Sequence, residues 1–219
     1  MMVRRYLIDD SVTCPARVVD KIETDVNIIR LDRTIFHPTS GSQRSDRGKI
    51  DNAQVLAVEL NGDFIDHYVD RSKGLVVGGE VLLCVDRAWR NLQCAYHTAG
   101  HFIVHALSAV MPECRVLIGQ HWPDQAVITC SAKGPMDATA MKALNDVVQA
   151  IIVADLPITT SISHGARYIR FGNLPPMVCT GTHLRRSSQL QRAQIIRSEF
   201  DSMRLRLHYT AYCLQSTGG

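Results

Sequence analysis

Two short patterns in the sequence contain the side chains that proteins use to bind zinc. The first, HTAGH, holds His97 and His101 four residues apart inside a predicted helix. Residues at this spacing share a helix face, so both imidazoles can reach one ion. The second, CTGTH, holds Cys179 and His183 at the same spacing on a predicted turn. Three nitrogens and one sulfur suit tetrahedral zinc, with the thiol bound as a thiolate.

Other interpretations of these residues remain open. Nine histidines make a chance pair at this spacing easy to find, and the four side chains are also compatible with an apolar buried cysteine and hydrogen-bonded core histidines. Cys94 and His105 lie roughly on the same helical stripe and are substitute ligands. We prefer the set of four because a single helix rarely directs four side chains at one metal. The remaining histidines show no paired spacing and are predicted to be structural: His37, His67, His121, His164 and His208.

The helix that carries HTAGH is predicted from Arg87 to about Val110. Asp86 is its expected N-cap, and apolar residues recur along it at helical spacing. A second helix is predicted from Met136 to about Ala154, ending before Pro157 because the residue before a proline resists helix. Strands are expected around and after it, at 115–120, 126–131, 158–163, 167–171, 191–197 and 203–209. This part of the chain is therefore predicted to be mixed α+β.

The residues before this helix have the pattern of a β domain. Short β-type runs cover 16–22, 27–36, 54–60 and 80–85, separated by turn residues. The runs Gln54–Leu60 and Phe64–Val69 predict a hairpin, because Asn61-Gly62 tolerates the positive φ angles of a type I′ turn. We expect two domains, 1–86 and 87–219, divided where composition changes.

Composition indicates an ordinary globular protein. The chain is 46% hydrophobic and 21% charged, and it has no uninterrupted apolar run of the about 18 residues that a membrane span needs. Met1–Asp10 does not resemble a secretory signal. Seven scattered cysteines, an odd number, do not form the framework of a small secreted domain, so we expect reduced thiols. A soluble, cytoplasmic protein without a membrane partner is predicted.

Positive charge is concentrated at the end of the sequence. From Leu184 onward the chain has six arginines against Glu199 and Asp201, a net +4, although the whole chain carries only +3. Cationic side chains gain affinity for nucleic acid by releasing counterions from its backbone. The asymmetry fits a phosphate-contacting surface, and a solvated strand face explains it equally well.

The sequence as a whole resembles the editing domain shared by alanyl-tRNA synthetase and the free-standing AlaX proteins. HTAGH followed about eighty residues later by CTGTH carries the resemblance, with matching segments at 86–90, 168–172 and 205–209. A related fold in threonyl-tRNA synthetase usually has proline before the last histidine, so Thr182 favours the alanine branch. The match spans roughly 30–210 and is similar to the medium-length AlaX proteins.

The resemblance extends to a loop at residues 36–48. The family pattern is aromatic-x-P-x-GGGQ-x-x-D-x-G, and here Pro38, Gln43, Asp46 and Gly48 match it. Of three consecutive glycines only Gly41 remains, between two serines. The family implies a small N-terminal β-barrel domain, here 1–86 with this altered loop, followed by a mixed α+β zinc-containing editing domain, 87–219.

The function implied by the resemblance is zinc-assisted hydrolysis of the 3′ aminoacyl ester of mischarged tRNA(Ala), above all of Ser-tRNA(Ala). ATP is not expected to be required. Zinc would be held by His97, His101, Cys179 and His183. Thr98 matches the threonine that recognises the serine hydroxyl, with a helix threonine bonded back to a carbonyl as the alternative, and Gln43 is a candidate site contact. Candidate tRNA contacts are Arg185, Arg186, Arg204 and Arg206. Two rival functions are a non-catalytic, zinc-stabilised tRNA-binding module and a small-molecule zinc esterase.

Overall fold

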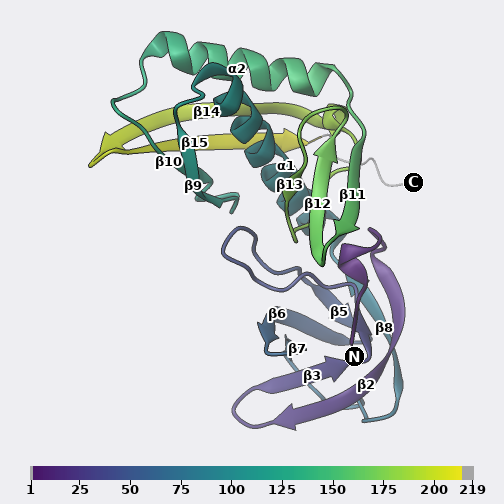
Figure 1. The fold of residues 1–219 in the computed structure, drawn as a ribbon. Helices are drawn as coiled ribbons and strands as arrows, with labels where there is room; N and C mark the ends of the chain where they lie inside the picture. Colours follow the sequence, from purple (N-terminus) through teal and green to yellow (C-terminus); the bar gives the residue numbers. More distant parts are fainter. Residues whose placement is uncertain (1, 214–219) are drawn as a thin grey trace. The chain divides into compact units, whose positions relative to one another are not determined.

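The computed structural model describes residues 2–213, which divide into two compact units (Figure 1). The first unit ends at Arg90 and the second begins at Asn91. This division falls in the first turn of α1 (Arg87–Val110), whereas the sequence placed the boundary just before that helix. Within residues 2–213 there are fifteen strands and two α-helices, which confirms the predicted α+β class.

The first unit is built around six antiparallel strands whose pairing closes into a barrel, in the order β2-β3-β7-β6-β5-β8 (Figure 1). In β2, the side chains of Cys14, Ala16 and Val18 are buried and those between them are exposed, the alternation of a strand with one face on a core. The strands are β2 (Thr13–Glu23), β3 (Asn27–Leu31), β5 (Gly48–Ile50), β6 (Ala53–Asn61), β7 (Phe64–Val69) and β8 (Glu80–Val85). A short parallel pair, β1 (Val3–Arg4) with β4 (Arg33–Thr34), and a 3-10 turn at Arg5–Leu7 complete the unit.

Two sequence predictions about these strands need correction. The run 27–36 is not one strand: it is interrupted at Asp32, whose carboxylate accepts the backbone N–H of Arg17 at 2.8 Å in place of a carbonyl. The hairpin of β6 and β7 is confirmed, but Asn61 pairs with Phe64 and only Gly62 in the turn has a positive φ, of 59°. One positive φ at the first turn position fits a type II′ turn and not the predicted type I′.

The second unit packs α1 and α2 (Ala138–Val153) with two antiparallel sheets. The larger sheet has the order β14-β15-β10-β9 and the smaller β11-β12-β13. The strands of the second unit are β9 (Arg115–Gln120), β10 (Val127–Ser131), β11 (Ile158–Ser163), β12 (Ala166–Phe171), β13 (Met177–Val178), β14 (Leu190–Asp201) and β15 (Arg204–Cys213), with a 3-10 turn at Ser187–Gln189. Most agree with the predicted runs, although β14 and β15 are longer.

An aspartate caps each helix, and α1 begins at the predicted Arg87. The Asp86 carboxylate accepts the N–H of Trp89 at 3.0 Å, and Asp137 accepts that of Ala140 at 2.7 Å. The second cap places the start of α2 at Ala138, two residues after the predicted Met136. Five fully buried residues of α1 face the core of the unit: Ala95, Ala99, Phe102, Ile103 and Ala106. In residues 2–213 no helix is long and apolar enough to cross a membrane.

A buried ion pair holds the loop at residues 36–48 to the start of α1. Asp46 is fully buried, and one of its oxygens accepts Arg90 Nε at 2.8 Å while the other accepts the N–H of His37 at 2.6 Å. Arg90 also donates to the carbonyl of Ile35 at 2.7 Å. Removing one partner of such a pair leaves an uncompensated charge and costs about 3–5 kcal/mol. The loop is therefore fixed to the first turn of the helix.

His67 lies inside the first unit as a neutral, doubly hydrogen-bonded ring. Its Nδ1 donates to the carbonyl of Ile29 at 3.0 Å and its Nε2 accepts the hydroxyl of Thr34 at 2.8 Å, while Thr34 accepts the N–H of Phe36. This network needs an unprotonated Nε2. Burial lowers the pKa of His67 to about 4, although the hydrogen bond to Ile29 and the charge of Asp66 act in the opposite direction. The prediction that His67 is structural agrees with these contacts.

Acid should therefore destabilise the first unit through His67. Its pKa is depressed in the folded state, so between pH 6.5 and about 4 only the unfolded chain binds the proton. Stability from this ring is complete above pH 6.5 and is lost as pH falls, by about 3 kcal/mol at the acid limit. Urea unfolding at several pH values measures the loss, and His67→Gln should reduce the pH dependence. A constant difference between the two proteins across this pH range would disprove the assignment.

Candidate metal centre

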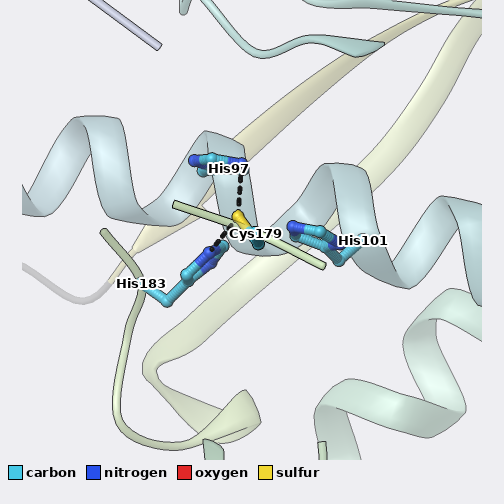
Figure 2. Close-up of side chains that lie close together, drawn as sticks. All are labelled: His97, His101, Cys179 and His183. Atoms are coloured by element: carbon cyan, nitrogen blue, oxygen red, sulfur yellow. Dashed lines mark hydrogen bonds between the residues drawn. The ribbon is translucent and has the colours of Figure 1, made fainter. Parts of the chain in front are cut away.

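The structure brings the four predicted zinc ligands together from two separate elements. His97 and His101 come from successive turns of α1, and Cys179 and His183 come from the turn after β13 (Figure 2). Their ligand atoms all lie within 4.8 Å of one another. Cys179 Sγ is 3.4 Å from His97 Nε2 and 3.2 Å from His183 Nε2. The group can therefore hold one metal ion.

The segment 179–183, which we call the ligand turn, is held by contacts from both sides. Arg167 on β12 donates through Nη1 to the carbonyls of Cys179 at 2.9 Å and Gly181 at 3.0 Å. The N–H of Cys179 donates back to the Arg167 carbonyl at 3.0 Å. From α1, the thiol of Cys94 donates to Thr182 Oγ1 at 3.2 Å. An irregular turn is thereby fixed against a strand and a helix.

Thr98 also belongs to this support. Its side chain is fully buried, and its Oγ1 accepts the N–H of Leu184 at 3.2 Å and lies 3.4 Å from His183 Nδ1. The expected role of Thr98 was recognition of the substrate hydroxyl. The contacts seen here join α1 to the end of the ligand turn and set the position of the His183 ring.

The electrostatics of His101 and Cys179 suit metal ligands. Burial lowers the pKa of His101 to about 3, with smaller contributions from His121 and His105, so the ring is neutral. Its Nε2 is buried, and no described residue forms a hydrogen bond with it. Burial raises the pKa of the Cys179 thiol, while the N–H of Gly181 and the charge of Arg167 act in the opposite direction. A zinc ion would satisfy the unpaired nitrogen and stabilise the thiolate.

The two substitute ligands considered from the sequence lie outside this group of four. Cys94 is bonded to Thr182. His105, one turn beyond His101, packs edge-on against Phe171 with ring centroids 5.7 Å apart. The choice of two elements over one helix agrees with this geometry, because the group of four takes two ligands from α1 and two from the ligand turn.

Sequence reasoning missed one imidazole at the site. His121, predicted to be structural, is buried and stacks on His97 with ring centroids 4.7 Å apart. Its Nδ1 is 2.6 Å from the hydroxyl of Tyr209, and burial lowers its pKa to about 4. No local spacing identifies it, because its neighbours in space come from α1 and β15.

The other predicted site residues are Gln43 and four arginines, none of which belongs to the group of four ligands. Gln43 is fully buried in the first unit, and its backbone pairs with Ser40. Arg185 and Arg186 are exposed, and Arg186 forms an ion pair with Asp155, with Nε at 2.7 Å. Arg204 is exposed and Arg206 half-buried on β15, on the face opposite to its buried leucines.

Comparison with known proteins finds alanyl-tRNA editing proteins and alanine–tRNA ligases among the relatives of this chain. No protein-family model matches the chain. The alanyl-tRNA editing protein AlaX-M of Pyrococcus horikoshii is 38% identical over 93 residues, 42% of this chain and 43% of the relative. AlaX-L of the same organism is 26% identical over 212 residues, 83% of this chain and 50% of the relative. Human mitochondrial alanine–tRNA ligase is 32% identical over 133 residues, 57% of this chain and 14% of the relative.

These matches confirm the resemblance to AlaX-type editing proteins and to part of the alanine–tRNA ligases. The chain spans half or less of the length of each of these three relatives. What the relatives act on is therefore carried to this chain only as a proposal.

Replacing His101 should abolish metal binding, whereas replacing His105 should not. Both are α1 histidines with a buried Nε2 that has no hydrogen-bond partner among the described residues, but only His101 belongs to the group of four. We expect about one zinc per chain in the wild type and in His105→Ala, and almost none in His101→Ala. Elemental analysis of the purified proteins measures this. Equal zinc content in the two variants would show that the metal is elsewhere.

Proposed function

We propose that this chain hydrolyses the aminoacyl ester of mischarged tRNA(Ala), with Ser-tRNA(Ala) as the preferred substrate. The observation that carries the proposal is the convergence of three imidazoles and one thiol within 4.8 Å, in a chain whose relatives include proteins named for alanyl-tRNA editing. Simple hydrolysis needs no ATP. The partner would be tRNA in the cytoplasm.

A hydrolytic site separate from the site that selects alanine overcomes a physical limit on amino acid selection. A pocket built for alanine cannot exclude the smaller glycine, and it rejects serine only modestly because the difference is one hydroxyl. Errors of this kind are removed by a separate hydrolytic site with its own selectivity. We place serine ahead of glycine because the resemblance to the AlaX proteins implies it.

In the proposed reaction, the zinc ion and the protein side chains have different roles. When bound by His97, His101, Cys179 and His183, zinc would supply Lewis acidity toward the ester carbonyl or a fixed point that orients the amino acid. Burial keeps the His101 imidazole neutral, and Arg167 holds the ligand turn in place. Four protein ligands form a closed set, so we propose the orienting role ahead of direct activation of water.

Thr98 and Gln43 receive different roles in this proposal. The Oγ1 of Thr98 already accepts the N–H of Leu184 and lies 3.4 Å from His183 Nδ1. We therefore propose that Thr98 acts through the position of His183 and not by touching the substrate. Gln43 keeps the role implied by the resemblance, a contact to the aminoacyl end of tRNA, and its loop is fixed by the hydrogen bond of Arg90 to Asp46.

Purified protein should release serine from Ser-tRNA(Ala) and leave Ala-tRNA(Ala) intact. Chelation of the metal, His101→Ala and Cys179→Ala should each lower the rate by about a hundredfold or more, since each removes the site or part of it. Acid-precipitable radiolabelled amino acid measures the remaining ester. His105→Ala is the matched control and should retain the wild-type rate.

Two outcomes would reject this activity in favour of the rival functions. Intact ester together with retained, zinc-dependent tRNA binding would indicate a non-catalytic module. Metal-dependent cleavage of a simple serine ester, with no preference for the tRNA-linked form, would indicate a small-molecule esterase.

The arginines of β15 should contribute to tRNA affinity. Arg204 and Arg206 lie two apart on one strand face, so both can meet one stretch of phosphates. Arg204→Ala/Arg206→Ala should weaken binding and reduce the salt dependence by about one counterion for each arginine replaced. Filter binding at several salt concentrations measures both. Lys142→Ala, an exposed cation on α2, is the control, and an equal salt slope in the two variants would exclude β15 from the interface.

A further inference from the structure

His121 is a buried aromatic side chain beside the candidate metal centre that the proposed hydrolysis does not use. It follows β9 directly and is 6% exposed. Its ring stacks on that of His97 at 4.7 Å and 28°, and its centroid is 6.1 Å from that of His101. One face of a candidate ligand is thus covered by a residue from another element.

Two glycines make room for this ring. A Cβ on Gly100, in the interior of α1, would overlap Nδ1 and Cε1 of His121 and lie 3.0 Å from the Tyr209 hydroxyl. A Cβ on Gly119, in β9, would lie 2.7 Å from Cε1 and 2.9 Å from Nε2 of the same ring. Neither glycine has a left-handed φ. Since glycine weakens both helices and strands, the space taken by His121 is the physical reason for both.

The ring is also fixed by hydrogen bonds. The Tyr209 hydroxyl donates to the carbonyl of Tyr96 at 3.1 Å, so it is free to accept Nδ1–H of His121 at 2.6 Å. Tyr96 is on α1 and Tyr209 on β15. The orientation of His121 is therefore set by the same helix that carries His97.

We propose that His121 is a positioning residue of the metal centre: it sets the plane of the His97 ring, and the absence of a side chain at Gly100 and Gly119 leaves the space that it occupies. A ligand ring left open on this side could rotate about its side-chain torsions, and the ion would lose one well-placed nitrogen. The inference rests on the proposed function only in requiring that the four residues bind a metal.

Titration of the metal-free protein with Co²⁺ tests this role without measuring activity. His121→Ala should weaken Co²⁺ binding by about tenfold and change the visible absorption bands that report ligand geometry. Tyr209→Phe, which removes only the hydroxyl, should shift both readouts in the same direction by less. His121→Phe, which keeps a stacking ring, should restore part of the affinity. His105→Ala is the control.

A pair of glycine variants tests the packing itself. Gly100→Ala should lower the melting temperature of the wild type, although alanine favours helix, because its methyl group displaces the His121 ring. The same change made in His121→Ala should raise the melting temperature instead. This reversal of sign is expected only if the ring is what excludes the methyl group.

The possible results separate the two proposals. If His121→Ala lowers the melting temperature but leaves the Co²⁺ affinity and spectrum equal to those of His105→Ala, His121 is merely structural and the inference is wrong. If the wild type binds no Co²⁺, the metal site and the positioning role both fail. Wild-type binding sensitive to His121, without hydrolysis of any aminoacyl-tRNA, would reject the proposed function and leave the inference standing.

Discussion

The hydrogen bonds that fix the ligand turn against β12 and α1 are the constraint on which the candidate site depends. Two of the four ligands lie on a helix, where spacing is set by the backbone, but Cys179 and His183 lie on an irregular turn. Such a turn has no repeating hydrogen bonds of its own. Instead, the side chain of Arg167 donates hydrogen bonds to two of its carbonyls. Thr98 secures the far end through the N–H of Leu184. Metal sites tolerate only small errors in ligand position, and these hydrogen bonds limit that error.

Much of this arrangement could be predicted from the sequence because its causes are local. The bounds of α1 follow from Asp86 and from apolar residues at helical spacing, and the structure reproduces them. The four ligands are recognisable because few residue types bind zinc and because each pair is spaced by one helical turn or a short loop. The two pairs form one site if the element that carries Cys179 and His183 packs against the helix. In the structure the four ligand atoms do lie within 4.8 Å of one another.

What could not be predicted depends on interactions between residues distant in the chain. Strand β5 is three residues long and gains its partners only when β6 and β8 flank it. The break at Asp32 depends on the N–H of a residue in the neighbouring strand. His121 has no partner at a recognisable spacing, and its role appears only when β9, α1 and β15 are packed together. A local sequence pattern describes one helix or strand at a time. A side chain that contacts several elements therefore looks like an ordinary core residue in the sequence.

The altered loop at residues 36–48 shows how a departure from a family pattern can preserve local geometry. The family has three glycines where this chain has Ser40, Gly41 and Ser42, and neither serine adopts a left-handed φ. Ser40 instead closes the turn through its side chain, which accepts the N–H of Gln43 at 3.0 Å, while its own N–H bonds the Gln43 carbonyl at 2.8 Å. Side-chain hydrogen bonds of this kind replace the freedom of glycine with a fixed turn. The serine substitutions are therefore compatible with a rigidly placed Gln43, and loss of the glycines is not by itself an argument against catalysis.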